Sequence, residues 1–345
     1  MNKKKNILTG MRPTGRLHLG HYVGALENWI NLQKEYNCSF LIADYQALGD
    51  YAEDIGRIRN SVIEVALDWL SVGLDPQKNN FVIQSYIPEY AELTLLLSMI
   101  TPKGMIDRNP TLKTEMAIQK DVSLGFYNYP ASQVADILLS KADLVPAGED
   151  QLPHIELTRE IARKFNRIYG NIFPVPQALI GRIPRLTGID GKAKMSKSLG
   201  NCIYLSDSEE EVIKKVKKMY TDPTRIKATD PGHIEGNVVF MYLEAFYQDK
   251  KELDNLKKKY INGGIGDVEI KKILSESLNN FLKPIREKRA FYKSHPQEIK
   301  KALIEGTLRA ETIAKKTITE VKNAMNISKY EDIENIKKII ASSSK

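Results

Sequence analysis

Two histidines near the N-terminus are placed where they could contact phosphate. His18 and His21 are three residues apart, with Gly20 between them, in a segment that follows a short apolar run. Residues three apart share one face of a helix, and imidazole nitrogens can donate hydrogen bonds to phosphate oxygens. A strand that turns into a helix also points backbone N–H groups at an anion, and glycine leaves room for a flat base. The segment fits neither the Walker loop nor the GxGxxG turn; two exposed histidines near a helix start are the alternative explanation.

A lysine-bearing segment about 175 residues downstream could act on the same phosphates. The run KMSKS spans residues 194–198, between Gly191 and Gly200, and its small polar residues predict a mobile loop. Lysines in such a loop can close on a triphosphate as negative charge develops during transfer. Alone, this run would be an ordinary solvated surface loop. Together with the histidine pair it indicates a nucleotide site.

The first half of the chain alternates the elements that would position these residues. Short apolar runs at residues 6–10, 39–44 and 80–84 predict buried strands, and apolar residues at helical spacing fill residues 22–33 and 58–72. Strands that alternate with helices of this length indicate βαβ units and a parallel sheet. Ligands of such sheets bind at the carboxyl ends of the strands. Another such strand is predicted at residues 142–146, after a mostly helical stretch over residues 90–140.

From about Ser206 onward, strand patterns fade and helical spacing dominates. The charge balance changes as well. Residues 1–200 carry 23 basic and 21 acidic side chains, and residues 201–345 carry 28 and 22, within a formal net charge of +8. A basic excess fits a surface that faces a polyanion such as nucleic acid. Solvated lysine-rich helix faces are the alternative explanation.

Composition excludes several other classes of protein. The chain of 345 residues is 42% hydrophobic and 8% aromatic, which is too apolar for a disordered protein. It has no apolar run of about 18 residues for a membrane span and no apolar stretch of a signal peptide, so a cytoplasmic location is expected. Cys38 and Cys202 cannot form a disulfide framework or a cysteine-rich zinc site, and we predict no structural metal.

The histidine pair and the KMSKS run resemble the two signature motifs of class I aminoacyl-tRNA synthetases, the second letter for letter. Three further segments are similar to bacterial tryptophanyl-tRNA synthetases. They are residues 125–138, with a tyrosine–proline pair followed by Ala135-Asp136, residues 144–160 (LVPAGEDQLPHIELTRE), and residues 220–224 (YTDPT). The resemblance covers nearly the whole chain.

This resemblance implies a Rossmann-like, parallel-sheet catalytic domain over residues 1–205 and an all-helical anticodon- and tRNA-binding region over residues 206–345. Within the first domain, residues 90–140 are the expected helical insertion and dimer face. The implied activity is that of a homodimeric ligase. It joins L-tryptophan to ATP, with Mg²⁺, to give tryptophanyl-adenylate and pyrophosphate, and then transfers tryptophan to the 3′ end of tRNA(Trp). The substrate carboxylate is the nucleophile, so the absence of a Ser/His/Asp constellation agrees with this chemistry.

The same resemblance assigns roles to individual positions. The implied catalytic residues are His18, His21, Lys194 and Lys197. The implied ATP contacts are Arg12, Pro13, Thr14, Gly20, His21, Gly148, Glu149, Asp150, Ile183, Lys194, Met195, Ser196, Lys197 and Ser198, with Lys113 toward the pyrophosphate end. The implied amino-acid contacts are Tyr129, Gln133, Asp136 and Gln151. A surface salt bridge is the alternative role of Lys113.

Some positions depart from the commoner family pattern. Arg12 and His21 replace Gln and Asn, and Gln133 stands where many tryptophan enzymes have Met. Since Tyr129, Gln133 and Asp136 also resemble the substrate helix of tyrosyl-tRNA synthetases, a tyrosine–tRNA ligase is the nearest alternative; the GEDQ run over residues 148–151 favours tryptophan. An HxGH-type nucleotidyltransferase and a non-catalytic RNA-binding relative are more distant alternatives.

Overall fold

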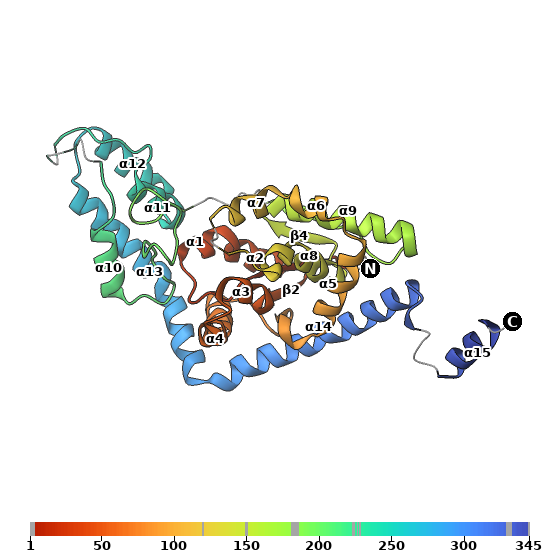
Figure 1. Ribbon diagram of the computed structural model, residues 1–345. Helices are drawn as coiled ribbons and strands as arrows, with labels where there is room; N and C mark the ends of the chain where they lie inside the picture. The colour runs from red at the N-terminus through yellow and green to blue at the C-terminus, as the bar shows by residue number, and fades with distance from the viewer. Residues whose placement is uncertain are drawn as a thin grey trace.

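Five parallel strands form one sheet in the order β3-β2-β1-β4-β5 (Figure 1). The computed structural model describes residues 4–118, 121–148, 151–180, 186–222, 225, 227, 229–328 and 333–343. The strands are β1 (Asn6–Met11), β2 (Asn37–Ile42), β3 (Asn80–Ile83), β4 (Leu144–Ala147) and β5 (Gln177–Ile180). This confirms the predicted α/β class with a parallel sheet. β5 has no counterpart among the predicted strands, because its four residues show no distinct period.

Alternate side chains of strands β1 to β4 enter two separate cores. Phe40, Ile42 and Phe81 pack on one face of the sheet, together with residues of α2 and α4. Leu41 and Val82 pack on the other face, against residues of α5, α8 and α9. Because both faces are covered, the strands are continuously apolar, as is usual for buried parallel sheets.

The strand order creates a switch point beside β1. The chain passes from β1 outward to β2 and β3, and then returns to add β4 and β5 on the other side. Such a reversal opens a crevice at the carboxyl ends of the two strands that flank it. The helices before β4 are α1 (Leu19–His21), a π-helical segment (Tyr22–Leu26), α2 (Glu27–Leu32), α3 (Asp44–Tyr51), α4 (Ile55–Val72), a 3₁₀ turn (Gln84–Tyr86), α5 (Glu89–Ile100), α6 (Lys103–Asp107), α7 (Pro110–Met116) and α8 (Leu124–Leu139); α9 (Leu152–Tyr169) follows β4.

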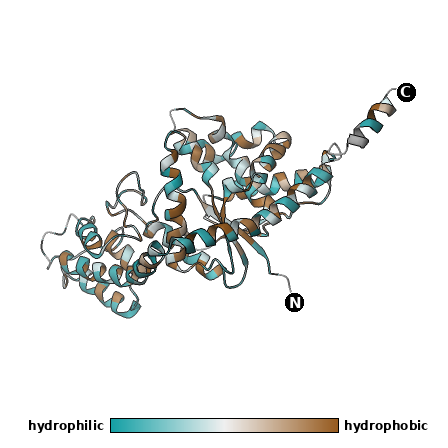
Figure 2. Cartoon of the chain, turned by 90° about the horizontal axis from the view of Figure 1, so that it is seen from below, coloured by the Kyte–Doolittle hydropathy of each residue, from teal (hydrophilic) through white to brown (hydrophobic). Residues whose placement is uncertain are grey.

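A lobe of helices follows the second signature segment. It comprises α10 (Glu209–Lys217), α11 (Val238–Phe246), α12 (Lys250–Ile261) and the first part of α13 (Asp267–Ser294), and it lies to one side of the sheet (Figure 1). Helices α10 and α12 are amphipathic: the buried side chains are Val212 and Val216 in α10 and Leu253, Leu256 and Tyr260 in α12, at the spacing of one helical face. Figure 2 shows the resulting alternation of brown and teal along these helices.

The chain then returns to the sheet. The far part of α13 packs against α4, and α14 (Pro296–Ala324) runs along β3. Thr307 Oγ1 accepts a hydrogen bond from the backbone N–H of Ile83 at 3.1 Å, and an added Cβ at Gly306 would lie 2.4 Å from the backbone nitrogen of Phe81. The helix therefore covers the open edge of the sheet, which would otherwise be free to pair with another strand. The last described helix is α15 (Ile333–Ser343).

Candidate active site

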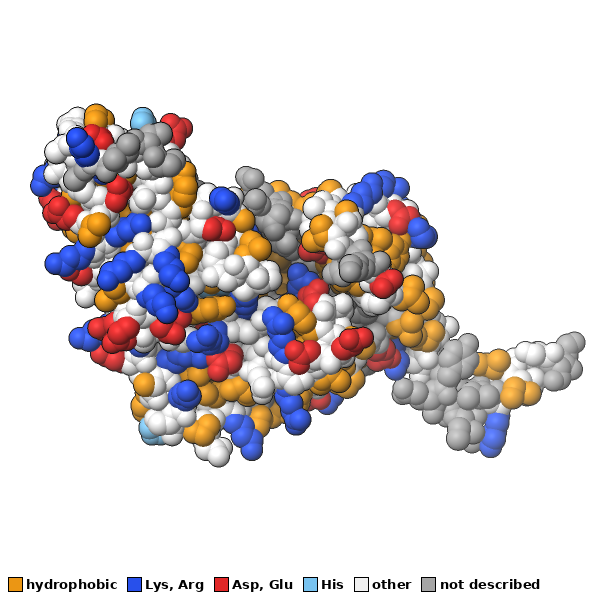
Figure 3. Space-filling model, turned by 60° about the vertical axis from the view of Figure 1, so that its left-hand side comes forward, with side chains coloured by type: hydrophobic (Ala, Val, Ile, Leu, Met, Phe, Trp, Pro, Cys, Tyr) orange, Lys and Arg blue, Asp and Glu red, His pale blue; other side chains and the backbone are white. Residues whose placement is uncertain are grey.

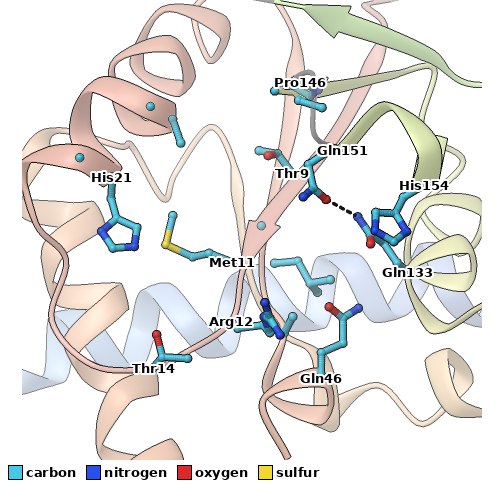
Figure 4. Close-up of a pocket in the computed structure, with 18 of the residues that line it drawn as sticks. Thr9, Met11, Arg12, Thr14, His21, Gln46, Gln133, Pro146, Gln151 and His154 are labelled. Atoms are coloured by element: carbon cyan, nitrogen blue, oxygen red, sulfur yellow. Dashed lines mark hydrogen bonds between the residues drawn. The ribbon is translucent and has the colours of Figure 1, made fainter. Parts of the chain in front are cut away.

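A cleft of about 1610 Å³ opens at the carboxyl ends of the strands. Figure 4 shows that it has two ends: His21 of α1 lies on one side, and Gln133 of α8, His154 of α9 and Gln151, the residue before α9, lie on the other. The cleft brings together most of the predicted site residues. They are Arg12, Thr14, His18, Gly20, His21, Tyr129, Gln133, Asp136, Gly148, Gln151, Lys194, Met195, Ser196, Lys197 and Ser198.

The histidine pair stands at the start of α1, with its two rings 3.7 Å apart between centroids. The backbone N–H of His18 donates to Nδ1 of His21 at 3.2 Å. The Nδ1 atom of His21 is thus an acceptor, so the proton of the neutral ring is on Nε2 and is available as a donor. Burial, reinforced by Lys197 and Lys194, lowers the pKa of His18 to about 3, and burial followed by the charge of His18 lowers the pKa of His21 well below its usual value. Both rings are therefore neutral donors at physiological pH.

Gly20 is tightly enclosed rather than open. An added Cβ would lie 3.0 Å from the ring of His18 and 3.5 Å from Cβ of Met195. The backbone N–H of Gly20 donates to the thioether sulfur of Met195 at 3.4 Å. Glycine at this position thus allows the second signature segment to approach the first helix.

The KMSKS segment is held in place at its base by Asn201, which is buried. Asn201 Oδ1 accepts from the backbone N–H of Ser196 at 2.7 Å, and its amide nitrogen donates to both carboxylate oxygens of Asp190 at 3.2 Å. Met195 is also buried, whereas Lys194 is exposed. The base of the loop is therefore fixed, and the lysines extend from it into the cleft.

Lys197 joins the two signature segments directly. Its Nζ donates to Thr14 Oγ1 at 3.2 Å and to the carbonyl oxygen of Gly15 at 2.9 Å. Gly15 has a φ of +114°, which glycine tolerates and other residues rarely adopt. Burial lowers the pKa of Lys197 to about 8, against the opposing effect of Asp68. The ammonium group is accordingly poorly solvated, which strengthens its interaction with any anion that enters the cleft.

The opposite end of the cleft contains a buried carboxylate, Asp136, which is 2% exposed. Its two oxygens accept from Nε2 of Gln84 and Nε2 of Gln46, each at 2.7 Å. Burial raises the pKa of Asp136 to about 7; the hydrogen bond from Gln84 opposes that rise and Asp44 adds to it. Each carboxylate oxygen has a second lone pair, so Asp136 can accept one more hydrogen bond from a ligand.

Tyr129 completes this end through a chain of hydrogen bonds. Asn109 Oδ1 accepts from two backbone N–H groups, so its amide nitrogen faces His154 Nδ1, at 3.1 Å. That contact places the ring proton of His154 on Nε2, which lies 3.2 Å from the hydroxyl of Tyr129. Gln133 donates to Gln151 at 3.5 Å (Figure 4). Asn109, which does not line the cleft, thus orients His154 and, through it, the hydroxyl of Tyr129.

Arg12 and the five predicted positions outside that list remain to be described. Arg12 lines the cleft between two carboxylates, with Asp50 at 2.9 Å and Glu115 at 3.8 Å. Pro13 is buried and Lys113 of α7 is exposed, and the structure places neither along the cleft. Glu149, Asp150 and Ile183 lie outside the described residues.

Comparison with known proteins decides the family. A family model described as tRNA synthetases class I (W and Y) matches residues 1–283. The chain belongs to this family. It is 49% identical over 338 residues to the tryptophan–tRNA ligase of Chlamydia caviae, covering 95% of this chain and 98% of that relative, and 48% identical to that of Clostridium longisporum, covering 96% and 99%. The tryptophanyl-tRNA synthetase of Campylobacter jejuni, solved with ADP and tryptophan, superimposes with a TM-score of 0.84 at 34% identity and covers 93% and 99%.

Three residues of this class I synthetase were not predicted as site residues. Gln46 follows β2 and Gln84 follows β3, both at the carboxyl ends of the strands where ligands bind; their positions were the only signal, since isolated glutamines have no motif. Arg57, near the start of α4, also lines the cleft, with its guanidinium 4.1 Å from the ring centroid of Tyr51. It adds a cation to the end that holds the lysines.

Two other kinds of feature are absent from the described part of the synthetase. Across the residues that the structure describes, no group of three or more His, Cys, Asp or Glu side chains could hold a metal ion. Within the same residues, no helix has the length and apolar character needed to cross a membrane.

Proposed function

We propose that this class I synthetase is a tryptophan–tRNA ligase. One observation carries the proposal: a single cleft has neutral imidazoles and lysines at one end and a buried carboxylate hydrogen-bond acceptor at the other. The first end suits the phosphates of ATP, and the second suits an amino-acid side chain with an N–H donor. The relatives at 48–49% identity bear the name of this activity.

In the first step, a carboxylate oxygen of tryptophan attacks the α-phosphorus of ATP. The bond from that phosphorus to the bridging oxygen breaks, and pyrophosphate leaves with the bond's electron pair. The chain supplies no nucleophile, so its contribution is position and charge. We propose that Nε2–H of His21 and the ring of His18 face the phosphates. Lys194 and Lys197 then stabilise the charge that develops on the leaving group, and Mg²⁺ enters bound to phosphate oxygens, its usual ligands.

In the second step, a hydroxyl of the terminal ribose of tRNA attacks the carbonyl carbon of the adenylate, and AMP leaves. We propose that the lobe of α10–α13 contacts the tRNA, as expected of residues 206–345. On the face shown in Figure 3, Lys and Arg side chains gather over this lobe. Lys214, Lys217 and Lys218 of α10 and the turn after it are exposed, and such side chains bind a phosphate backbone in a salt-dependent way.

Amino-acid choice depends on Asp136. The indole N–H of tryptophan only donates, so it needs an acceptor that donates nothing in return, which an ionised carboxylate provides. The phenol of tyrosine can both donate and accept, and it would also fit a carboxylate. The names of the relatives favour tryptophan over tyrosine.

We also propose that the protein works as a homodimer in the cytoplasm, where translation consumes its product. Leu95 and Met99 are 57% and 70% exposed on α5, within the helical insertion over residues 90–140 that is expected to form the dimer face. Tyr86, on the 3₁₀ turn just before this insertion, is 70% exposed. Exposed apolar side chains this close together are typical of an interface. Light scattering of Leu95→Asp should give a monomer from a wild-type dimer; a wild-type monomer would contradict the proposal.

Amino-acid-dependent ATP–pyrophosphate exchange tests the function, with each of the twenty amino acids in turn. Exchange with tryptophan alone would support the proposal. Exchange with tyrosine would indicate the tyrosine ligase. Exchange with no amino acid would favour either a nucleotidyltransferase acting on another metabolite or a non-catalytic RNA-binding protein, and would refute the proposal.

A further inference from the structure

An ion cluster around a buried aspartate lies where α13 packs against α4. Asp68 of α4 is 0% exposed. Arg289 of α13 donates to Asp68 Oδ1 through one guanidinium nitrogen and to Glu64 through the other. The cluster therefore joins the long helix that leaves the lobe to a helix of the catalytic domain.

The other oxygen of Asp68 reaches the first signature segment. Its Oδ2 accepts from the backbone N–H of Leu17 at 2.8 Å, one residue before His18. The carbonyl of Leu17 accepts from the N–H of Leu205 at 3.0 Å, and the N–H of Leu19 donates to the carbonyl of Ile203 at 2.9 Å. Residues 17–19 thus pair with residues 203–205, which follow the KMSKS run. Asp68 binds the backbone N–H at the first of these paired residues, Leu17.

We propose that Arg289 and Asp68 form a positioning pair through which α13 holds both signature segments in their reactive arrangement. Neither side chain lines the cleft, so neither touches substrate. Asp68 acts through the backbone of Leu17 and through its charge on Lys197; the amide measurement below isolates the first of these routes. The proposal rests on the proposed function for its effect on rate. Its structural part, that Arg289 holds the Leu17 backbone through Asp68, can be tested separately.

The charges explain why the pair works as a unit. A buried carboxylate that loses its cation is left with an uncompensated charge, and burial already raises the pKa of Asp68 to about 6 against the opposing effect of Arg289. Without Arg289, the free-energy cost of the buried charge falls if Asp68 takes up a proton or moves toward solvent. Either change weakens the hydrogen bond from Leu17, because a charged acceptor binds an N–H more strongly than a neutral one.

The kinetic test uses full-length Arg289→Met, Asp68→Asn and the double variant in tryptophan-dependent ATP–pyrophosphate exchange, with active sites titrated. Each single change should lower kcat about tenfold, by loss of a charge-assisted hydrogen bond, and change the KM for tryptophan by less than about twofold. The double variant should be about as slow as the slower single, because the two residues act through one contact. Arg289→Lys, which keeps a cation beside Asp68, should recover most of the rate.

Arg286→Met is the matched control. Arg286 is on the same helix and also half-buried, but it pairs with Glu209 and Asn279 inside the lobe. The rate of ATP–pyrophosphate exchange should be nearly unchanged in this variant. The proposal would be wrong if Arg286→Met slowed exchange as much as Arg289→Met, or if the two single effects multiplied in the double variant.

Hydrogen–deuterium exchange tests the role of Arg289 and Asp68 independently of the proposed enzymatic activity. Arg289→Met should speed exchange of the Leu17 amide about tenfold relative to Arg286→Met, since one hydrogen bond to a charged acceptor is weakened. Equal protection in the two variants would overturn the proposal whatever the activity. If the wild-type protein showed no tryptophan-dependent exchange, the proposed function would fail, and the amide measurement would still decide the role of the pair.

Discussion

Replacing Asp136 with asparagine should lower the use of tryptophan. Each carboxylate oxygen of Asp136 accepts from a glutamine amide nitrogen at 2.7 Å, from Gln46 or from Gln84. In Asp136→Asn, the new amide nitrogen must face one of these donors or the indole N–H. One buried donor is therefore left unpaired, which costs about 1–3 kcal/mol. That cost corresponds to a loss of about 5- to 150-fold in kcat/KM for tryptophan.

Pyrophosphate exchange with tryptophan and with phenylalanine measures this effect. Phenylalanine has no N–H on its ring, so its kcat/KM should change little and the preference for tryptophan should shrink. Asp44→Asn is a suitable control at a pH well above the pKa of Asp136, where the charge of Asp44 no longer affects the ionised fraction of Asp136. Asp44 lies near Asp136 but bonds to Ser85 outside the cleft. If Asp136→Asn kept the wild-type kcat/KM for tryptophan, the assignment of this pocket would be wrong.

The pH dependence of kcat/KM for tryptophan gives a second test of Asp136. The pKa of Asp136 is raised from its ordinary value of 3.8 to about 7, and the ionised form is the one that accepts from indole. The kcat/KM for tryptophan should therefore rise as pH increases through about 7, and this rise should be absent in Asp136→Asn. The folding stability of the free protein should change with pH in the opposite direction. The contribution of Asp136 to the free energy of unfolding is complete below about pH 3.8 and is lost as pH rises to about 7.

Three further changes test other parts of the account. Lys197→Ala should slow adenylate formation about 10²-fold in single-turnover experiments while tryptophan affinity measured by calorimetry stays near wild type; equal losses in both would mean that the lysine only holds substrate. Lys214→Gln, Lys217→Gln and Lys218→Gln together should weaken tRNA binding and flatten its salt dependence without changing exchange, and an unaltered salt slope would place the tRNA elsewhere. Gly306→Ala should lower the free energy of unfolding by about 1–3 kcal/mol in urea titration, because the new methyl meets the backbone of β3; wild-type stability would show that α14 shifts freely.

Patterns within short segments predicted much of the molecule. Apolar runs identified β1, β2 and β3, because strands buried on both faces are continuously apolar. The motifs around His18 and Lys197 identified one end of the cleft, and the resemblance to a known family pointed to Tyr129, Gln133 and Asp136, which line the other end.

Long-range contacts could not be predicted in this way. Gln46 and Gln84 reach Asp136 only because β2 and β3 end beside it, and no local pattern distinguishes them from surface glutamines. The return of α14 to β3 depends on a close approach at Gly306, which in the sequence is one small residue in a long helix. The neutral state of His18 and His21 likewise follows from burial under the lysine loop, which spacing alone does not reveal.

Charging of tRNA tests the central claim most directly. The full-length protein, ATP and Mg²⁺ would be incubated with a tRNA(Trp) transcript and labelled tryptophan, with a tRNA(Tyr) transcript and labelled tyrosine in parallel. The account predicts tryptophan esterified to the 3′ end of tRNA(Trp) and no tyrosine on tRNA(Tyr). Charging with tyrosine, or no charging of either transcript by a protein that is folded and binds ATP, would contradict it.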